Sequence, residues 1–383
     1  MPEIEQLPDG VFLGLEEKIY FGQKGRLGST DLAKLHTRGV GWWWSSEYNP
    51  DFVPEAEDAK SRTFGKALHA LILEGEEALN SRFSLIPSKD EMRAKHGDLF
   101  CVTVGDIEKA LESRGMNPKK MRKDEIIAYA RSRAPDLQVW DTVEAGWAKA
   151  NVGKLGITAA ERRQLEVMER SIRGHHEMGA LFETTPDNVP ISEVSILWTD
   201  EHGLKRRARL DALLPKYTID LKTLTNVGQR PLQFAAGEHV AKWAYHCQMA
   251  DHHDARRRAY RMILAGQVSG GTVAERKWLS LFPEHAVNWA YAWLLYQRPD
   301  AKAGQAPIVL PWAEDYGSQL HMDGIRARRR AIDLYRRSVA QFGLDKPWTR
   351  IEPVHSTAEG SVHRVFLPSW IAEEAIIGED DEL

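Results

Sequence analysis

The stretch KRRARLDALLPKYTIDLKTL, residues 205–224, decides the fold of this chain. Within it, the segments 205–214 and 217–224 have the alternating pattern of β-strands, and a short Pro-Lys turn separates them. A His-Gly turn joins the first of these segments to another strand-like stretch, SEVSILWT at 192–199. Three strands joined by short turns predict an antiparallel meander.

The period of two along these strands predicts which side chains share a face. In the first strand of the hairpin, one face carries Arg207, Arg209, Asp211 and Leu213, and the other, predicted core face carries Ala208, Leu210, Ala212 and Leu214. In the second strand, Asp220 and Lys222 share a face opposite Ile219, Leu221 and Thr223. Two neighbouring strands can therefore bring together Asp211, Asp220 and Lys222.

Helical patterns lie on both sides of the meander along the chain. Ser29 is a predicted N-cap, and Gly75 is the predicted end of an apolar helix that contains His69. Thr158 and Glu161 form a predicted capping box. The other predicted elements are helices at 158–182 and 232–264, strands at 287–297 and 306–311, and a basic helix at 315–342. The order helix, meander, helix, strand predicts an α+β core.

The composition is that of an ordinary soluble protein. Of 383 residues, 43% are apolar and 28% are charged, and no stretch approaches the ~20 apolar residues of a membrane span. The first ten residues lack the basic and apolar regions of a secretion signal, so a cytoplasmic location is expected. Cys101 and Cys247 lie far apart and are expected to be ordinary buried thiols, with neither a disulfide framework nor a thiolate zinc site.

The net charge of −4 is unevenly distributed. Basic residues cluster at 205–209, 256–258 and 326–337, and an acidic run at 379–382 offsets them. Each basic cluster by itself is typical of a solvated surface. Only convergence of these clusters on one cleft would make a track for the phosphates of a nucleic acid.

Asp211, Asp220 and Lys222 have the chemistry that phosphodiester hydrolysis needs. Mg²⁺ takes oxygen ligands from one or two carboxylates and lowers the pKa of a bound water, and a nearby cation stabilises the developing charge. The spacing D-x8-D-x-K on paired strands supplies these groups. The alternative is a solvent-facing hairpin with a surface Asp-Lys pair, since D-x-K triplets are common.

Several histidines have two interpretations each. His69, on its apolar helix, is either a hydrogen-bonded core residue or a metal ligand. Tyr245, Gln248 and His252 share one face of the helix after the meander, and this face either reads a DNA end or is merely polar. The stripe His239, His246 and His253 lacks acidic or thiolate partners, which favours surface positions over a zinc site.

Separated motifs in a fixed order resemble one family. They are STDLAKL at 29–35 with Trp44 beyond it, FGKALHALILE around His69, NSRF at 80–83, GITAAE at 156–161, the strand beginning at Glu193, RARLD ending at Asp211, IDLKT around Asp220 and Lys222, YHCQ at 245–248, and LPSW at 367–370. With these motifs the sequence resembles the exodeoxyribonuclease VIII (RecE-type) family of phage recombination exonucleases, within the PD-(D/E)xK superfamily. This implies a PD-(D/E)xK core, an α+β fold with a central mixed sheet flanked by helices.

The resemblance also implies roles for individual residues. His69, Asp211 and Asp220 would hold Mg²⁺, or Mn²⁺ as a substitute, with help from the Leu221 carbonyl. Lys222 would position the attacking water, with Glu193 and Gln248 as supporting residues of the catalytic site. The candidate DNA-binding residues of the core are Arg207, Arg209, Tyr245 and His252. Two positions depart from the family pattern: Leu210 replaces a proline, and His252 stands where the related QxxxY motif has tyrosine.

A segment at about 100–135 interrupts the family pattern and resembles a SAP-type helix-extended-helix DNA-binding module. Its predicted core consists of Ile107, Leu111, Gly115, Ile126 and Ile127. From 103 to 134 it carries eight Lys/Arg against five Asp/Glu, a local charge of +3, with Lys119 and Lys120 as candidate DNA-binding residues. A helical hairpin that merely packs on the core is the alternative. The expected organisation is an N-terminal segment at 1–27, an exonuclease domain at 28–99 and 136–372, the insertion at 100–135 and an acidic tail at 373–383.

The function that the resemblance implies is a Mg²⁺-dependent exodeoxyribonuclease that degrades one strand of linear duplex DNA, 5′ to 3′, and exposes single-stranded DNA for recombination. It implies a homo-oligomeric ring on the DNA end and a RecT-like single-strand annealing protein as partner, with no membrane. One alternative is a related nuclease that is specific for single strands or cuts internally. Another is a DNA-end-binding protein whose nuclease site has decayed, which the joint presence of His69, Asp211, Asp220 and Lys222 argues against.

Overall fold

The predicted meander lies at the centre of a mixed sheet in the computed structural model, which describes residues 5–53, 57–118, 121–185, 188–226, 230–281, 289–300 and 304–349. Within these ranges, the strand order is β10 (Val268–Gly270), β1 (Gly10–Leu13), β7 (Ile191–Thr199), β8 (Lys205–Leu213), β9 (Tyr217–Thr223), β11 (Ala290–Gln297) and β12 (Ile308–Asp315), and β2 (Leu27–Gly28) pairs with the start of β8. β7, β8 and β9 are antiparallel, whereas β1 with β10, β2 with β8 and β9 with β11 are parallel. The central mixed sheet of the predicted fold class is confirmed.

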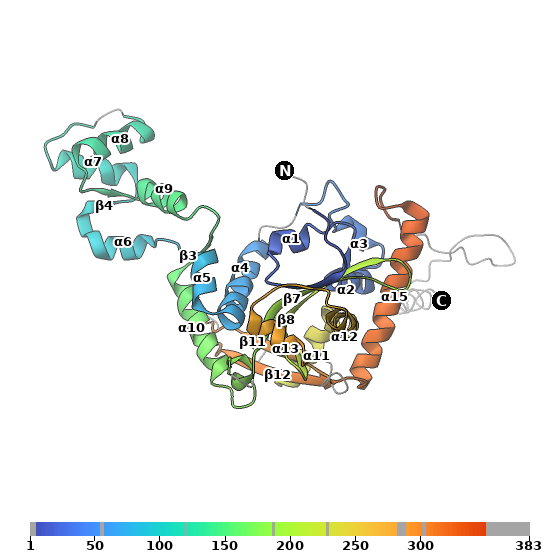
Figure 1. The fold of residues 1–383 in the computed structure, drawn as a ribbon. Helices are drawn as coiled ribbons and strands as arrows, with labels where there is room; N and C mark the ends of the chain where they lie inside the picture. The colour runs from blue at the N-terminus through green and yellow to red at the C-terminus, as the bar shows by residue number, and fades with distance from the viewer. Residues whose placement is uncertain are drawn as a thin grey trace, which may run out of the picture.

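Helices cover both faces of this sheet (Figure 1). The core helices are α1 (Glu17–Phe21), α2 (Ser29–Arg38), α3 (Gly41–Trp44), α4 (Glu57–His69), α5 (Glu76–Arg82), α10 (Ala159–Arg173), α11 (Leu232–Lys242), α12 (Tyr245–Leu264), α13 (Val273–Leu279) and α15 (Gln319–Phe342). Along β11, Ala292, Leu294 and Tyr296 pack with α4 and α10, while Tyr291, Trp293 and Leu295 pack with α11 and α12. Alternate side chains of the strand are thus buried on opposite faces, and each large apolar one contributes about 1.5–3 kcal/mol.

Local signals explain where several helices begin and end. Thr158 and Glu161 form the predicted capping box, with each backbone N–H donating to the other residue's side chain. Gly75, with φ of 90°, follows a π-helical turn, η1 (Ala70–Glu74), that extends α4. The helix predicted at 158–182 is shorter than expected, because α10 ends at Arg173 and only a 3₁₀ turn, η3 (Gly179–Phe182), follows.

Two other local predictions are wrong. The helix predicted at 232–264 is divided into α11 and α12 by Ala244, which is buried in a left-handed conformation with φ of 52°. This break changes the chain direction, so that α12 begins with Tyr245 beside Lys222. Ser29 is the first residue of α2 rather than its N-cap, and its hydroxyl donates to the buried carboxylate of Asp251 at 2.9 Å.

A small helical lobe projects from the core on two paired chain segments, β3 (Phe83–Leu85) and β6 (Leu155–Ile157) (Figure 1). The lobe contains α6 (Lys89–His96), the 3₁₀ turn η2 (Gly97–Leu99), β4 (Phe100–Cys101), α7 (Val104–Glu112), α8 (Lys123–Arg133), β5 (Gln138–Val139) and α9 (Trp140–Ala150). Ile107, Leu111 and Ile126 are buried in its own apolar core. α6 and α9 flank the predicted insertion at 100–135, so the separate lobe is larger than that segment.

The chain ends also differ from the expected organisation. β1 comes from the segment 1–27, which was expected to precede the domain, and it lies between β10 and β7 in the main sheet. The predicted acidic tail at 373–383 and the LPSW motif at 367–370 lie outside the described residues. Cys101 and Cys247 are buried free thiols, as predicted. Across the described ranges, no helix combines the length and apolar character that crossing a membrane requires.

The three basic clusters do not converge on one track in the described structure. Arg206 of β8 and Arg328 of α15 both bind the buried carboxylate of Asp251, at 2.6 and 2.9 Å. Arg256 is buried and donates to the Leu214 carbonyl at 2.7 Å. These arginines therefore fasten α12 and α15 to the sheet, and a phosphate track through all three clusters is not formed.

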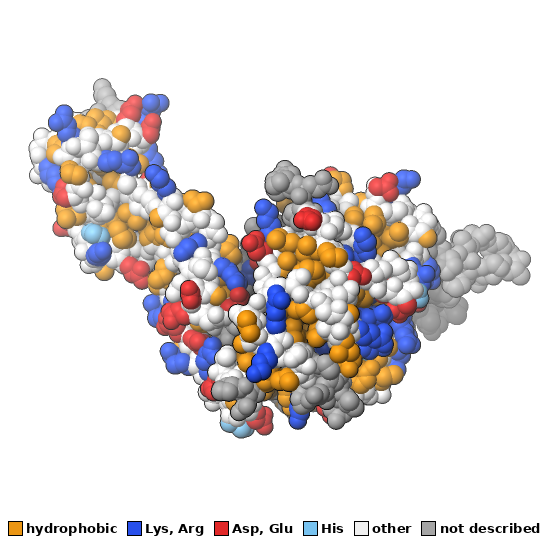
Figure 2. Space-filling model, in the orientation of Figure 1, with side chains coloured by type: hydrophobic (Ala, Val, Ile, Leu, Met, Phe, Trp, Pro, Cys, Tyr) orange, Lys and Arg blue, Asp and Glu red, His pale blue; other side chains and the backbone are white. Residues whose placement is uncertain are grey.

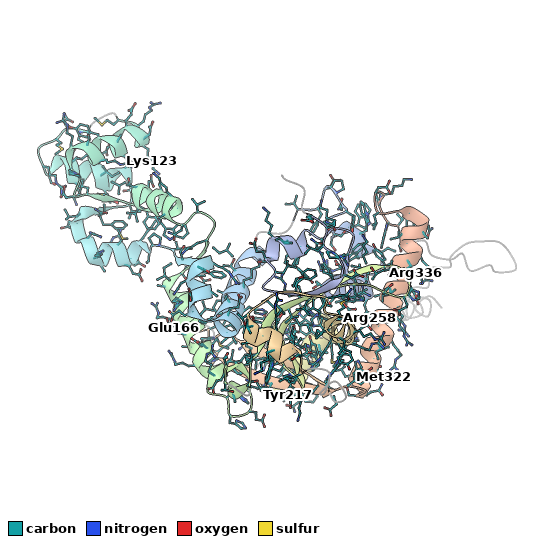
Figure 3. All side chains as sticks on the ribbon, viewed as in Figure 1. Lys123, Glu166, Tyr217, Arg258, Met322 and Arg336 are labelled. Atoms are coloured by element: carbon teal, nitrogen blue, oxygen red, sulfur yellow. The ribbon has the colours of Figure 1, made fainter. Side chains whose placement is uncertain are left out.

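Charges on the lobe and on α15 are also far apart. Lys123 of the lobe and Arg336 of α15 lie on opposite sides of the molecule (Figure 3). On the visible face of the lobe, basic and acidic side chains are interspersed (Figure 2). On that face the charges of the lobe are therefore mixed, without a single basic patch.

Of the three histidines of the stripe on α11 and α12, His253 does not lie at the surface. His253 is only 2% exposed, and neither ring nitrogen has a hydrogen-bond partner within the described residues. Its ring packs against His321, Tyr316 and Tyr291. Burial lowers the pKa of His253 to about 3, with His321 adding to the shift. The surface position favoured from the sequence is wrong for His253, because α12 is enclosed between the sheet and α15.

Acidification is expected to weaken the fold through His253. In the unfolded chain its pKa is near 6.5, so between about pH 6.5 and pH 3 only the unfolded state takes up a proton. The free energy of unfolding should therefore fall by up to about 1.4 kcal/mol per pH unit as the pH drops through this window. In His253→Phe the ring contacts remain and the titration is lost. Urea unfolding at pH 7 and pH 5 should show a smaller difference for this variant than for the parent, and equal differences would contradict the assignment.

Candidate active site

The pairing between β8 and β9 stops next to Asp211, one of the predicted site residues. Ladder pairing joins Ala212 to Ile219 and Leu213 to Thr218 and does not continue to Asp211. Instead, the Leu221 N–H donates to the Asp211 carboxylate at 2.8 Å. Asp211 thus takes the place of a ladder partner, and its side chain lies between the two strands.

Opposite Asp211, β7 carries a break in its own ladder at Glu193. Ser192 pairs with Ala212 and Val194 pairs with Leu210, but Glu193 has φ of 53° and forms no ladder pair. The alternation predicted for β8 holds only as far as this point. Ala208 and Leu210 pack in the cluster that contains Ala255 and Ala259 of α12, whereas Ala212 and Leu214 pack with α4. The single predicted core face is therefore wrong, because both faces of β8 are covered and the inward side changes at Asp211.

His69 reaches the same place from the end of α4, beside the π-helical turn. Its Nε2 lies 3.3 Å from the Leu221 carbonyl oxygen, and its Nδ1 lies 3.7 Å from Asp211 Oδ2. π-Helical turns are rare and are frequently found at functional sites. The side chain is 26% exposed, so His69 lies at the edge of the core rather than within it.

His69, Glu193 and Asp211 form a set of possible metal ligands. One donor atom from each residue lies within 4.8 Å of the others. Burial and the charge of Asp211 together raise the pKa of Glu193 to about 8, although Arg209, 3.7 Å away, opposes the shift. A bound cation would relieve the repulsion between these two acids, so the donor set suits a divalent metal ion.

Asp220 and Lys222 lie next to this set on β9. Asp220 is only 1% exposed, and its Oδ1 is 2.8 Å from Lys222 Nζ. Burial raises the pKa of the Asp220 carboxyl, opposed by Lys222 and reinforced by Asp211. Burial opposes the charge on Lys222, but the charges of Asp220 and Asp211 outweigh it and raise the pKa of the ammonium group. Asp220 is not one of the three clustered donors, and it contacts the site through Lys222.

The three residues on the face of α12 that was predicted to read a DNA end differ in their burial. Tyr245 lies against Lys222, whose Nζ is 5.4 Å from the centre of the ring, and Gln248 is half-buried one turn later. His252 is 2% exposed, and its Nδ1 is 2.9 Å from the Tyr291 hydroxyl oxygen. Burial lowers the pKa of His252 to about 4, with Asp220 opposing the shift. His252 is therefore enclosed beneath the site, and the prediction that it contacts DNA is wrong for this structure.

The other DNA-binding candidates have different surroundings. Arg209 donates to Ser195 Oγ at 2.9 Å and to the Leu15 carbonyl at 2.7 Å, and its guanidinium lies 4.4 Å from the Tyr20 ring centre. One nitrogen of Arg207 donates to the backbone carbonyls of Tyr20, Phe21 and Gln23 at the C-terminal end of α1. Both guanidinium groups are therefore held by the N-terminal segment. Lys119 and Lys120 lie outside the described residues.

Two residues near the site were missed by the sequence reasoning. Tyr291 of β11 is fully buried beside His252, and burial raises the pKa of its phenol, with Asp220 and Asp211 raising it further. Arg209 was treated only as a DNA contact, although it lies beside Glu193. The aromatic strand at 287–297 was predicted, but nothing in its pattern shows that it pairs with β9 in parallel.

Comparisons with known proteins show one family match and a solved structure of low similarity. Residues 146–265 match the sequence model of a family described as a PDDEXK-like domain of unknown function (DUF3799). The matched part includes Glu193, Asp211, Asp220, Lys222 and Gln248 but not His69. No curated protein matches the chain significantly. A crystal structure of a protein from Eubacterium rectale, provisionally described as an exonuclease, is similar over 97% of this chain and 100% of that one, with 11% identity and a TM-score of 0.37. The central part of this chain, which contains β7, β8 and β9, is thus similar in sequence to a PDDEXK-like domain family.

Proposed function

We propose that this protein is a divalent-metal-dependent exodeoxyribonuclease that degrades one strand of linear duplex DNA. The observation that carries the proposal is the convergence of His69, Glu193 and Asp211 beside the Asp220-Lys222 pair. The PD-(D/E)xK-like match supports nuclease chemistry in general. Action from an end, 5′-to-3′ polarity and a role in recombination rest on the family that the sequence resembles.

The residues present fit a Mg²⁺ ion, with Mn²⁺ as a substitute. By the family resemblance, His69, Asp211, Asp220 and the Leu221 carbonyl would hold the ion, and Glu193, whose carboxylate lies in the donor set with His69 and Asp211, would support it. Bound there, the ion would neutralise charge on the scissile phosphate and lower the pKa of a water molecule. The mixture of carboxylate, carbonyl and imidazole ligands suits Mg²⁺ and Mn²⁺ better than a soft metal ion, since no thiolate lies among them.

The protein's own groups would orient the reaction. Lys222, held by Asp220 at 2.8 Å, presents a cation beside the metal ligands, where it would position the attacking water and stabilise the developing charge. Tyr245 covers one side of Lys222 and limits its movement. Gln248, one turn further along α12, would contact the substrate from the same side. Because these groups lie on a strand and a helix, their positions are set before DNA binds.

The partners proposed with this function are duplex DNA ends, further copies of this chain in a ring, and a RecT-like annealing protein that receives the single strand. A ring through which duplex enters would hold the enzyme on one strand through many cuts.

The function can be tested on end-labelled linear duplex and on the same sequence as a covalently closed circle, each with Mg²⁺ or with EDTA. We expect the linear DNA to be degraded only with Mg²⁺ and the circle to be spared. Labels at the 5′ and 3′ ends report polarity through the order in which they are released. Cleavage of the circle would show an endonuclease, and activity in EDTA would exclude the metal assignment.

Deleting the lobe is expected to weaken DNA binding and leave the nuclease intact. A short flexible linker in place of residues 87–153 would join β3 to β6, and the main sheet receives no strand from that range. If the lobe contacts phosphates, each lost contact reduces the slope of log affinity against log salt by about 0.9. Fluorescence anisotropy at several salt concentrations measures this slope. A deletion protein that cuts at the parental rate with unchanged affinity and slope would show that the lobe does not bind DNA.

A further inference from the structure

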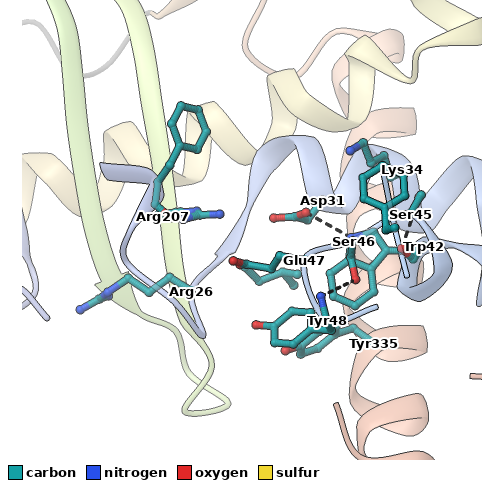
Figure 4. Close-up of a pocket in the computed structure, with 13 residues that line it drawn as sticks. Arg26, Asp31, Lys34, Trp42, Ser45, Ser46, Glu47, Tyr48, Arg207 and Tyr335 are labelled. Carbon is teal, nitrogen blue, oxygen red and sulfur yellow. Dashed lines mark hydrogen bonds between the residues drawn. The ribbon is translucent and has the colours of Figure 1, made fainter. Parts of the chain in front are cut away.

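A cavity that none of the metal ligands lines lies between α2, α15 and the loop after α3 (Figure 4). Its volume is about 280 Å³, just below the ~300–1,000 Å³ typical of small-molecule sites. Aromatic rings and charged groups line it together, among them Trp42, Tyr48, Phe52, Asp31, Glu47 and Arg207. A duplex does not fit in such a space, but a single small ligand does.

The aromatic part of the cavity offers stacking faces. Trp42 is 2% exposed and forms the floor, and the half-buried Tyr48 ring lies 5.8 Å from it, centre to centre. At the rim, Phe21 and Phe52 are 54% and 41% exposed. Large apolar rings exposed around a cavity commonly mark a binding site. A flat ligand placed here would cover rings that now contact water.

The polar part offers hydrogen-bond acceptors and a donor. The Asp31 carboxylate is oriented by the Gly28 N–H at 3.0 Å and by Trp42 Nε1 at 3.1 Å. Glu47 points into the same space and makes no ion pair with any residue that the structure describes (Figure 4). Arg207 is anchored through Nη1 to the carbonyls near α1, and its guanidinium points toward Asp31. A ligand with both N–H groups and carbonyl oxygens would satisfy this set.

The cavity and the metal ligands lie along the same strand. Arg207 and Asp211 are on the same side of β8, four residues apart, which corresponds to about 13 Å. At about 3.4 Å for each stacked nucleotide, this is about four nucleotides of a DNA strand. A strand bound at the metal ligands can therefore reach the cavity with a base near its end.

We propose that this cavity binds one unpaired nucleobase of the DNA strand, with a preference for guanine. The proposal rests on the proposed function of the neighbouring site. Unpaired bases are commonly stacked on aromatic side chains and read by hydrogen bonds along their edges. Carboxylates accept from amino groups of bases, and arginine donates to the carbonyl and ring nitrogen of guanine. Guanine has both kinds of group, whereas thymine has no amino group for Asp31 or Glu47.

The test measures binding of dGMP, dTMP and inorganic phosphate to the full chain in EDTA, by calorimetry. Without metal, the carboxylates at the nuclease site repel phosphate, so binding reports on the cavity. We expect dGMP to bind more tightly than dTMP and inorganic phosphate not to compete. Tyr48→Ala should weaken dGMP binding roughly tenfold, the scale of one lost base stack, while Tyr48→Phe should retain it. Glu47→Ala should reduce the preference for dGMP over dTMP.

A matched control is Phe234→Ala, since Phe234 is 64% exposed on α11 and does not line the cavity. Equal dGMP affinity in the parent and Tyr48→Ala would overturn the proposal, as would displacement of dGMP by inorganic phosphate at similar concentration. Because no hydrolysis is measured, the two proposals fail separately. A protein that binds dGMP through Tyr48 but never cuts DNA refutes the nuclease, and one that cuts DNA but does not bind dGMP through Tyr48 refutes the base pocket.

Discussion

Asp220→Asn is expected to lower the rate of DNA hydrolysis by about 10³-fold or more, the scale expected when a catalytic group in a preorganised site is lost. The amide has the shape of the carboxylate but is a poor ligand for Mg²⁺, and it no longer neutralises Lys222 at 2.8 Å. DNA binding should remain, because Asp220 is 1% exposed and makes no contact at the surface. Single-turnover cleavage of labelled duplex with saturating Mg²⁺, together with anisotropy in EDTA, measures the two effects.

Asp251→Asn is the matched control. Asp251 is also fully buried and also ion-paired, to Arg206 at 2.6 Å and Arg328 at 2.9 Å, but its partners are structural arginines, whereas Asp220 is paired with Lys222 next to the donor set. This variant should lower the denaturation midpoint, since it removes the buried charge that Arg206 and Arg328 share and leaves them only Asp200 and Asp254, and folded molecules should still cut. If Asp220→Asn keeps activity within about tenfold of the parent, Asp220 does not belong to the active site.

His69→Ala is expected to lower activity by about 10²-fold or more and to raise the metal concentration needed for half-maximal rate. The imidazole lies 3.7 Å from Asp211 and 3.3 Å from the Leu221 carbonyl, so its loss removes one ligand from the set. The fold should tolerate the change, because the side chain is 26% exposed. A titration of cleavage rate against Mn²⁺ and a thermal melt separate the two properties.

Leu68→Ala tests the opposite combination on the same helix. Leu68 is 0% exposed, so its truncation should cost about 2–5 kcal/mol of stability while turnover per folded molecule is preserved. His69→Ala should therefore lose activity and keep its stability, whereas Leu68→Ala should lose stability and keep its activity. A His69→Ala protein that melts far below the parent but keeps full turnover and metal dependence would make His69 a structural residue.

Most of the central hairpin could be predicted from local patterns. Strand and turn residues placed β7, β8 and β9 within one or two residues of their observed ends. The same alternation put Asp220 and Lys222 on one face of β9, and they form an ion pair there. The alternation failed after Asp211, where Glu193 adopts a positive φ that no periodic pattern describes. Strained conformations of this kind concentrate at functional sites, because the surrounding structure holds them in place.

The role of each polar residue was harder to predict than its secondary structure. His252 shares a helix face with Tyr245, but the break at Ala244 and the packing of β11 enclose it against Tyr291. The sequence pattern of Arg206 and Arg328 is typical of surface charges, but both bind Asp251 inside the protein. Burial depends on which elements pack above a residue, and a helix or strand pattern contains no information on its neighbours.

The sequence by itself determined the meander, the spacing of Asp211, Asp220 and Lys222, and the apolar helix around His69, since period, turns and caps act between residues that are close along the chain. Only the tertiary structure decided how closely His69 approaches Leu221, 152 residues away, that β1 joins the main sheet, and that a cavity forms beside Arg207. The physical reason is that these contacts depend on how helices pack over a twisted sheet. Small changes in that packing move side chains by ångströms without changing the local pattern.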